Sequence, residues 1–417
     1  MPLDRLTGVL DAHVGELRRR GTAKGAEAVV TAVIPASGPR GPRFLLEGYG
    51  DKQFIRMNSN SYLGMGLRPE IIRAEEEAAQ RFGAGPGAVR FISGTYAPHV
   101  ELERRLAAFH GREAAMLFSS AYAAMVGTLV PLITDQTIVI SDELNHNCII
   151  NGIRLARPLD KVVYPHLDMA ALERALADAA GRARRVVVVT DGIFSMRGDH
   201  APLDRIMELA RAYDDRFEEN VIVVVDDSHG VGAFGATGRG TEEYTGSPPA
   251  DVLIATLGKA LGVNGGYVAS SASVIGYLRE TSPFYIYSNP ITPAEAAAAL
   301  RALEILDSDE GRRLLDRLRA LTRRFEAGLI ELGFEVIPGE HPVVPLMIRD
   351  TERTRELVAY LREHGVLATG LSYPVVPRGD EEIRFQVSAE HTEADIDEVL
   401  GVLAAYQESR RQGGVTV

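Results

Sequence analysis

The chain has only one cysteine among its 417 residues, and it has no apolar run long enough to span a membrane. A single cysteine, Cys148, excludes an intramolecular disulfide and is typical of proteins kept in a reducing compartment. The N-terminal residues contain no uncharged apolar stretch followed by a cleavage site, so we expect no secretory signal. These absences predict a cytoplasmic protein with no membrane span.

An excess of positive charge is missing as well. The 45 lysines and arginines are outnumbered by 57 aspartates and glutamates, which gives a net charge of -12. This balance argues against a nucleic-acid partner, although it leaves room for a local basic patch that binds an anionic ligand. Hydrophobic residues, in contrast, make up 46% of the chain, which is ample for a large buried core.

Apolar segments alternate with helical patterns through the middle of the chain. Valine-rich runs separated by helices predict an α/β fold with a mostly parallel central sheet, flanked by helices on both faces. The predicted strands are Ala115–Phe118, Thr137–Ile140, Lys161–Tyr164, Arg185–Thr190, Val221–Val225, Val252–Ala255 and Gly266–Ala269. In sheets of this kind, ligands bind beyond the carboxyl ends of the strands.

The pattern changes on either side of this region. Apolar residues at helical spacing within residues 1–20 predict an N-terminal helix. A long helical stretch to about residue 331, followed by short strands and further helices, predicts a smaller C-terminal α/β domain. We therefore expect an N-terminal arm over residues 1–60, a large domain over 61–295 and a small domain over 296–417.

Lys259 lies between two glycines, just after the apolar run that ends at Ala255. A lysine buried in this way must be paired, neutralised or converted into a Schiff base. Asp226 and His229 follow another apolar strand, and an acid that partners a pyridine nitrogen is typical of pyridoxal phosphate (PLP) sites. A phosphate-binding P-loop is excluded because Leu253 and Ala260 stand where glycine and a hydroxyl residue are required. A metal site is not expected, because Asp226 and His229 have no third ligand at suitable spacing.

Ser119, Ser120, Ala121 and Tyr122 lie between a predicted strand and an apolar helix that starts near residue 123. The free N–H groups at a helix start bind phosphate well, but a serine there is also an ordinary helix cap. Because Lys259 is present, we favour the PLP phosphate.

Two more residues each have two interpretations. His146 either stacks on a cofactor ring or caps a helix at the surface, and Cys148 nearby raises the possibility of a Cys/His nucleophile pair, although a buried structural thiol fits better. Arg384 lies in a predicted strand, where its planar guanidinium suits a substrate carboxylate. The alternative is an exposed arginine paired with Glu381 or Glu382.

With these residues in place, the chain resembles the α-oxoamine synthases among the fold-type I PLP-dependent transferases, from about residue 40 to 405. The resemblance is closest to the glycine C-acetyltransferase (2-amino-3-ketobutyrate CoA ligase) branch. The motifs that carry it are specific in combination: Asn60-Ser61-Tyr62-Leu63-Gly64, Val89 to Thr95, Asn145-His146, Asp191 to Met196, Val225 to His229, Thr256 to Lys259, Ser288-Asn289, Ser372 to Pro377 and Ile383-Arg384.

The resemblance implies a role for each matching position. Lys259 matches the lysine that binds the cofactor and transfers the proton, Asp226 the partner of the ring nitrogen, and His229 the partner of the ring oxygen. His146 matches the histidine stacked on the ring, and Ser195 a residue near the ring oxygen. The phosphate contacts and substrate contacts implied in the same way are Ala121, Tyr122, Thr256, Ser288 and Asn289 for the phosphate, and Asn60 and Arg384 for the amino-acid carboxylate.

The reaction implied by the resemblance joins a small amino acid, expected to be glycine, to an acyl-CoA and releases an α-amino ketone and CoA. Ser288 and Asn289 match a contact donated by a second subunit, so a homodimer with shared active sites is expected. The chain departs from the family at Asn147-Cys148, which replaces the usual Ala-Ser, and from the acetyltransferases at Ser61, which replaces their second asparagine. These differences leave the substrate pair open, including pairs like those of serine palmitoyltransferase or 8-amino-7-oxononanoate synthase. Transamination and a non-catalytic role also remain as alternatives.

Overall fold

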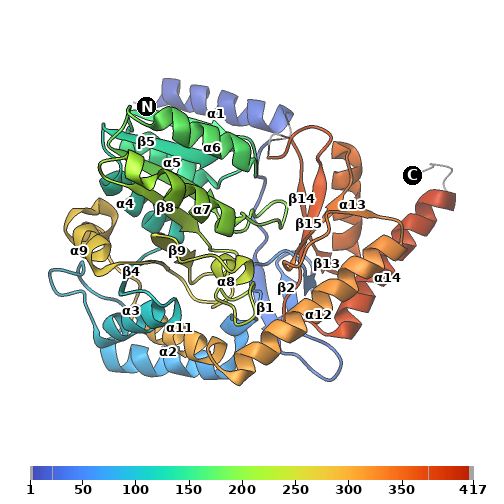
Figure 1. Ribbon diagram of the computed structural model, residues 1–417. Coiled ribbons are helices and arrows are strands. Elements are labelled where there is room, and N and C mark those ends of the chain that lie inside the picture. Colours follow the sequence, from blue (N-terminus) through green and yellow to red (C-terminus); the bar gives the residue numbers. More distant parts are fainter. Residues whose placement is uncertain (1–2, 21, 374, 413–417) are drawn as a thin grey trace.

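The computed structural model describes residues 3–20, 22–373 and 375–412. A large mixed sheet with its helices forms one side of the molecule, and a smaller sheet with three long helices forms the other (Figure 1). Among the described helices, none is long and apolar enough to cross a bilayer.

The large sheet has seven strands in the order β4-β10-β9-β8-β7-β5-β6, and all seven were predicted from the sequence. Strands β5 to β9 pair in parallel, whereas β10 runs antiparallel to both of its neighbours, β4 and β9. The bounds are β4 (Ala114–Phe118), β5 (Thr137–Asp142), β6 (Asp160–Tyr164), β7 (Arg185–Asp191), β8 (Val221–Asp226), β9 (Val252–Thr256) and β10 (Gly266–Ser270).

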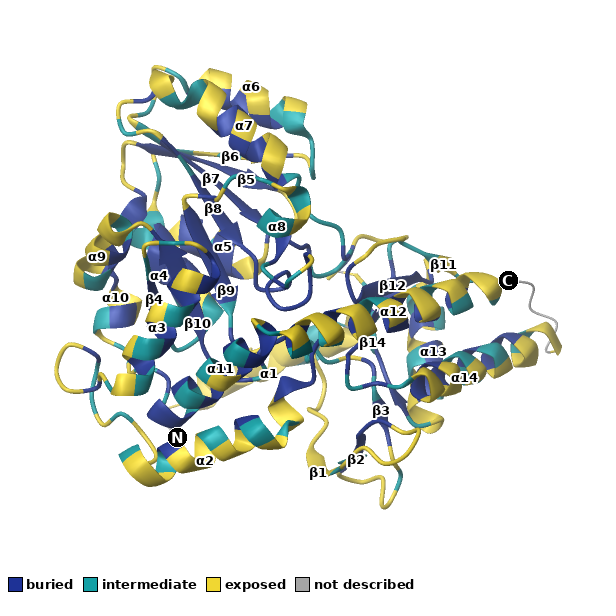
Figure 2. Ribbon diagram, turned by 60° about the horizontal axis from the view of Figure 1, so that its bottom comes forward, coloured by how far each residue is buried: buried dark blue, intermediate teal, exposed yellow. Residues whose placement is uncertain are grey.

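Helices cover both faces of this sheet, and alternate residues of each strand point to opposite faces. One face packs against α6 (Met169–Ala179) and α7 (Leu203–Tyr213), and the other against α4 (Ala121–Leu132), α5 (Asn147–Ala156) and α9 (Ala272–Thr281). Apart from the edge strand β6, the strands are buried along nearly their whole length and are dark in Figure 2. This double burial is the reason that their sequences read as continuous valine and isoleucine runs.

The small sheet has the order β11-β12-β15-β14. Its strands are β11 (Glu335–Val336), β12 (Val343–Met347), β14 (Thr369–Leu371) and β15 (Glu382–Gln386), and its helices are α12 (Asp309–Glu331), α13 (Thr351–Glu363) and α14 (Glu393–Gln412). The sequence predicted one helical stretch running to residue 331, but the structure has two helices. The first, α11 (Pro293–Leu306), ends before Ser308, whose hydroxyl accepts from the backbone N–H of Glu310 and so starts α12.

The N-terminal segment contacts the C-terminal part of the chain. It contains α1 (Asp4–Arg19), β1 (Val30–Ile34), β2 (Arg43–Leu46) and β3 (Ile55–Arg56), and β3 pairs in parallel with β13 (Val366–Leu367). Arg43, which is buried, lies 2.8 Å from Asp395 on α14. The remaining helices are η1 (Met65–Leu67), α2 (Pro69–Phe82), α3 (Ala97–Phe109), η2 (Asp214–Arg216), α8 (Thr241–Thr245) and α10 (Pro283–Ile286).

Candidate active site

The carboxyl ends of the parallel strands form one wall of a cavity of about 220 Å³. Asp191 and Asp226 are the last residues of β7 and β8 and lie opposite each other in register. Of the twelve predicted site residues, eight line this cavity: Ala121, Tyr122, His146, Ser195, Asp226, His229, Thr256 and Lys259. The edge of the sheet thus brings together residues from five separate segments of the chain, as its topology requires.

Lys259 follows β9 in a tight turn and lies at the boundary between this cavity and a second one of about 570 Å³. Burial lowers the pKa of Lys259, because a charged ammonium is poorly solvated there, and the carboxylates of Asp226 and Asp191 only partly oppose the effect. The amine is therefore more available as a nucleophile and base than that of a surface lysine.

Asp226 and His146 are joined through Cys148. The Cys148 thiol donates to Asp226 Oδ2 at 3.6 Å, and its sulfur lies 3.0 Å from His146 Nδ1. Burial and the neighbouring carboxylates raise the pKa of the Cys148 thiol, so it stays protonated at neutral pH. Although the two groups are in contact, this raised pKa disfavours a Cys/His nucleophile pair, because a protonated thiol is a poor nucleophile. Burial also lowers the pKa of His146, which keeps its ring neutral.

His229 is fixed from two sides. Its Nδ1 lies 2.7 Å from the hydroxyl of Tyr62, which is fully buried, and its backbone oxygen accepts from His341 Nε2 at 2.9 Å. Burial, reinforced by the charge of Lys259, holds the pKa of His229 well below its usual value, so the imidazole is neutral. One ring nitrogen then contacts Tyr62, which leaves the other for a ligand in the cavity.

The start of α4 forms a cradle of backbone N–H groups. Ser120 caps this helix by accepting from the Ala123 N–H at 3.1 Å. The N–H groups of Ala121 and Tyr122 belong to the first turn, where no helix carbonyl can accept from them. The helix begins at Ala121, two residues before the predicted start, and that earlier start is what gives these two N–H groups their position. The close approach of β10 depends on Gly266, where an added Cβ would lie 2.3 Å from the Ala121 nitrogen.

Arg384 lies on β15 of the small sheet, and Asn60 lies in the segment before η1. Asn60 lines the 570 Å³ cavity together with Lys259, and Arg384 Nη1 donates to the backbone oxygen of Ser195 at 3.0 Å. Among the described residues, Arg384 is half-buried and forms no ion pair with Glu381 or Glu382, which argues against an exposed arginine paired with a glutamate. Burial raises the pKa of Glu382 to about 8 despite the nearby Arg384, so this carboxyl is mostly neutral at pH 7. The guanidinium is left with hydrogen-bonding capacity for a carboxylate.

Ser288 and Asn289 follow α10 and line neither of these cavities. The neighbouring Tyr287 exposes 79% of its surface, an unusual value for a large aromatic side chain. A single chain therefore does not bring Ser288 and Asn289 to Lys259.

Sequence reasoning gave no role to three residues of the site. Asp191 lies beside Asp226, and burial together with that neighbouring charge raises its pKa well above the usual value. Tyr62 and His341 hold His229 in place. The position of Asp191 at the end of a predicted strand was a usable signal, whereas the contact with His341 joins segments 112 residues apart and has no local signature.

Residues 52–403 match the family model for class I and II aminotransferases. The chain is 39% identical to an 8-amino-7-oxononanoate synthase from Citrifermentans bemidjiense, over 91% of this chain and 94% of that protein. It is also 39% identical to the mitochondrial 2-amino-3-ketobutyrate coenzyme A ligase of Bos taurus, over 95% of this chain and 90% of that protein. A serine palmitoyltransferase variant from S. paucimobilis with a bound PLP–myriocin aldimine superposes with a TM-score of 0.86 at 27% identity, over 99% of each chain.

Proposed function

Because this chain belongs to the class I and II aminotransferase family, and within it to the α-oxoamine synthases, we propose that it condenses glycine with an acyl-CoA to give an α-amino ketone and CoA. The family is PLP-dependent, and its α-oxoamine synthases are acyltransferases that use an amino acid and an acyl-CoA. The observation that carries the proposal is the place of Lys259, a lysine of lowered pKa that lines the 220 Å³ cavity together with Asp226 and the 570 Å³ cavity together with Asn60. Two branches of the family match at equal identity, so the choice of glycine, and of acetyl-CoA or a longer acyl group, is part of the proposal.

The donor and acceptor groups of the cavity fit PLP. The free N–H groups of Ala121 and Tyr122 suit its phosphate, with the Thr256 hydroxyl close to the same turn. Asp226 suits the protonated ring nitrogen, and the neutral His229 suits the ring oxygen. Bound PLP supplies an electron sink for the Cα atom of the amino acid.

The remaining groups hold and stack against the cofactor. We propose that His146 lies against the ring face, and its neutral imidazole costs little to place there. Ser195 lies on the same wall of the cavity. Tyr62 keeps His229 in one orientation through the 2.7 Å contact between its hydroxyl and Nδ1.

Lys259 is the base that we propose takes the proton from Cα. Its lowered pKa increases the neutral fraction near neutral pH, which a general base requires. Arg384 and Asn60 hold the substrate carboxylate, and this contact orients the Cα–H bond toward Lys259. After proton removal, Cα attacks the thioester carbonyl, and the thiolate of CoA leaves.

We also propose a homodimer in which the partner subunit's Ser288 and the partner subunit's Asn289 reach the phosphate. Support comes from exposed apolar side chains next to this segment, with Phe91 and Ile92 each 64% exposed.

We further propose that residues 1–60, 61–295 and 296–417 act as arm, large domain and small domain. We also propose that the enzyme works in the cytoplasm, where its free thiol stays reduced.

The test is CoA release from acyl-CoAs of graded length with glycine, serine or alanine. Lys259→Ala should abolish CoA release and the cofactor absorbance that depends on this lysine, whereas Lys161→Ala, at an exposed lysine of β6, should change neither. Turnover retained in Lys259→Ala would disprove the role of this base. Amino transfer that depends on a keto acid, without CoA release, would favour an aminotransferase, and indifference to added PLP would favour a non-catalytic protein.

A further inference from the structure

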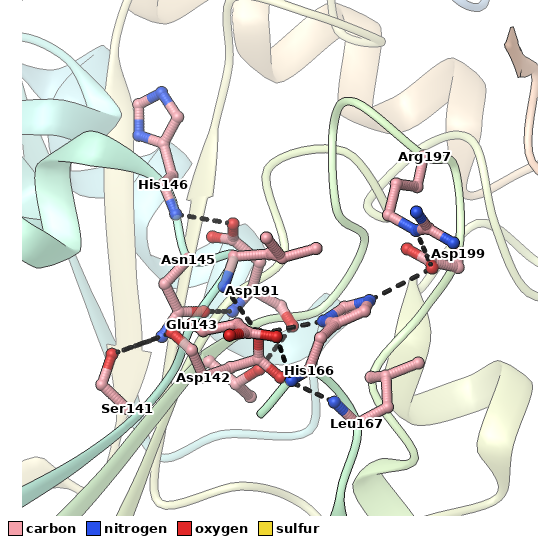
Figure 3. A network of polar contacts seen from close by, with 12 residues as sticks. Ser141, Asp142, Glu143, Asn145, His146, His166, Leu167, Asp191, Arg197 and Asp199 are labelled. Atoms are coloured by element: carbon pink, nitrogen blue, oxygen red, sulfur yellow. Dashed lines mark hydrogen bonds and ion pairs between the residues drawn. The ribbon is translucent and has the colours of Figure 1, made fainter. Parts of the chain in front are cut away.

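A network of polar contacts extends from the cavity and joins three loops at the carboxyl edge of the large sheet (Figure 3). His166, two residues after β6, lies at its centre, between two carboxylates. Its Nδ1 is 3.0 Å from Asp142 Oδ1, and its Nε2 is 3.1 Å from Asp199 Oδ2. A carboxylate only accepts hydrogen bonds, and a neutral imidazole has a single N–H, so both contacts are satisfied only by the charged imidazolium.

The backbone around His166 is tied to the loop that follows β5. The His166 N–H donates to Glu143 Oε1 at 2.8 Å, and the Leu167 N–H donates to Asp142 Oδ2 at 3.0 Å. Leu167 has a φ of 58°, in the left-handed region that is costly for a leucine. Such a conformation persists where surrounding contacts hold it, and it is found preferentially at functional sites.

On one side, the network leads to His146. Asp142 is the last residue of β5, and its Oδ1 also accepts from the Leu144 N–H at 2.9 Å, which shapes the turn before His146. Asn145, in the same turn, accepts from the Asp191 N–H at 2.8 Å. The His146 N–H donates to Asp191 Oδ2 at 2.9 Å, and Figure 3 shows this contact beside the ones made by Asn145.

On the other side, the network leads to Ser195 and Arg384. Asp199 Oδ2 accepts from Arg197 Nε at 3.0 Å as well as from His166, and the backbone oxygen of Asp199 accepts from the Phe194 N–H at 2.9 Å. The Phe194 ring lies edge-on to the His166 ring, with centroids 4.3 Å apart. The next residue, Ser195, carries the backbone oxygen that Arg384 contacts.

We propose that His166 is a positioning residue for the reaction: as a charged bridge between Asp142 and Asp199, it fixes the loop that carries His146 relative to the loop that carries Ser195 and receives Arg384. His146 and Arg384 then keep a fixed position relative to each other. This inference rests on the proposed function for its kinetic consequence, but the bridge itself is a property of the folded protein. His166 does not line the 220 Å³ cavity, so His166 affects the substrates only through other residues.

The bridge has a defined pH range. Burial opposes the charged ring, but the hydrogen bonds to Asp142 and Asp199 outweigh it and raise the pKa of His166 to about 9. Two other charged groups face this network. Glu143 accepts from the backbone N–H of His166, and Arg197 donates to Asp199. Because the folded-state pKa is raised, the contribution of the bridge is complete below the unfolded value of about 6.5 and is lost as pH rises through about 9.

The test compares the PLP-loaded wild type with His166→Gln and Asp199→Asn. His166→Gln keeps one donor but no charge, so kcat/KM for the amino acid should fall about tenfold or more, as expected when binding groups are misplaced. Asp199→Asn removes one carboxylate from His166, so the alkaline limb of the pH profile should move about one unit toward neutral pH. His364→Gln, at an exposed histidine after α13, should leave both unchanged.

Two further measurements separate this inference from the proposed function. The melting temperature and the circular dichroism of the bound cofactor can both be measured between pH 7 and 10 without turnover. In the wild type, both should change near pH 9, and in His166→Gln this change should be absent. The bridge would be overturned if His166→Gln showed the same pH dependence of both readouts as the wild type. It would also be overturned if the alkaline limb of the pH profile did not move in Asp199→Asn. If His166→Gln fails to fold, Asp199→Asn alone decides. Failure of the wild type to release CoA would count against the proposed function and leave the bridge to be judged on these two readouts.

Discussion

At the scale of single residues, the site works by controlling which groups carry charge. His146 and His229 are held neutral, and Cys148 is held protonated, because burial penalises the charged form of each. Lys259 has a lowered pKa for the same reason. Arg384, on β15 of the small sheet, offers a planar guanidinium that suits an anionic ligand.

Arg384→Ala should raise the KM for the amino acid about tenfold to a hundredfold, since a charge-assisted hydrogen bond contributes about 1.5–3 kcal/mol. The dissociation constant of PLP should change little, because the arginine lies on the substrate side and its guanidinium contacts the backbone oxygen of Ser195. Arg349→Ala, at a half-exposed arginine paired with Glu335 and Asp380, is the control. Steady-state kinetics and a PLP titration measure the two effects, and the opposite pattern would move Arg384 out of the substrate site.

At the scale of helices and strands, the sequence predicted the elements that are buried on both faces and missed those set by distant contacts. The seven strands of the large sheet were identified because each is a continuous apolar run between helical patterns. The pairing of β3 with β13 could not be predicted, because two-residue strands some 310 positions apart leave no local pattern. The break before α12 was missed although Ser308, followed by Asp309 and Glu310, is a usable helix-start signal, because helical patterns lie on both sides of it.

The junction of β4, α4 and β10 provides a prediction at this scale. Gly266→Ala places a Cβ 2.3 Å from the Ala121 nitrogen, so the first turn of α4 must move and its free N–H groups with it. We expect PLP affinity to fall about tenfold or more, since these N–H groups would otherwise bond an anion. The same substitution at Gly276 on α9 meets nothing within 4 Å and serves as the control. Unchanged PLP affinity in Gly266→Ala would mean that the start of α4 is not the phosphate site.

At the scale of the whole molecule, the site lies where several separate parts of the chain meet. The large sheet supplies Lys259 and Asp226, the segment before η1 supplies Asn60, and the small sheet supplies Arg384. The predicted site residues from these parts each belong to a motif that can be read from the sequence. The groups that hold them, such as His341 behind His229 and His166 behind the strand ends, depend on the tertiary fold and were not identified.

The exposed apolar surface next to the site leads to the last prediction. Tyr287, Phe91 and Ile92 are 79%, 64% and 64% exposed, and their segments are neighbours because Arg90 lies 5.6 Å from the centre of the Tyr285 ring. Exposed apolar groups gathered in this way are typical of an interface, so Tyr287→Glu should shift a dimer toward monomers by placing a charge there. If the partner subunit's Ser288 and the partner subunit's Asn289 reach the phosphate, PLP occupancy should fall in the same variant as the dimer dissociates. Sedimentation velocity at several protein concentrations, combined with cofactor absorbance, measures both, and Ile330→Glu, at a 54% exposed position on α12, is the control. A monomeric Tyr287→Glu protein that keeps full PLP affinity would show that each subunit builds its cofactor site alone.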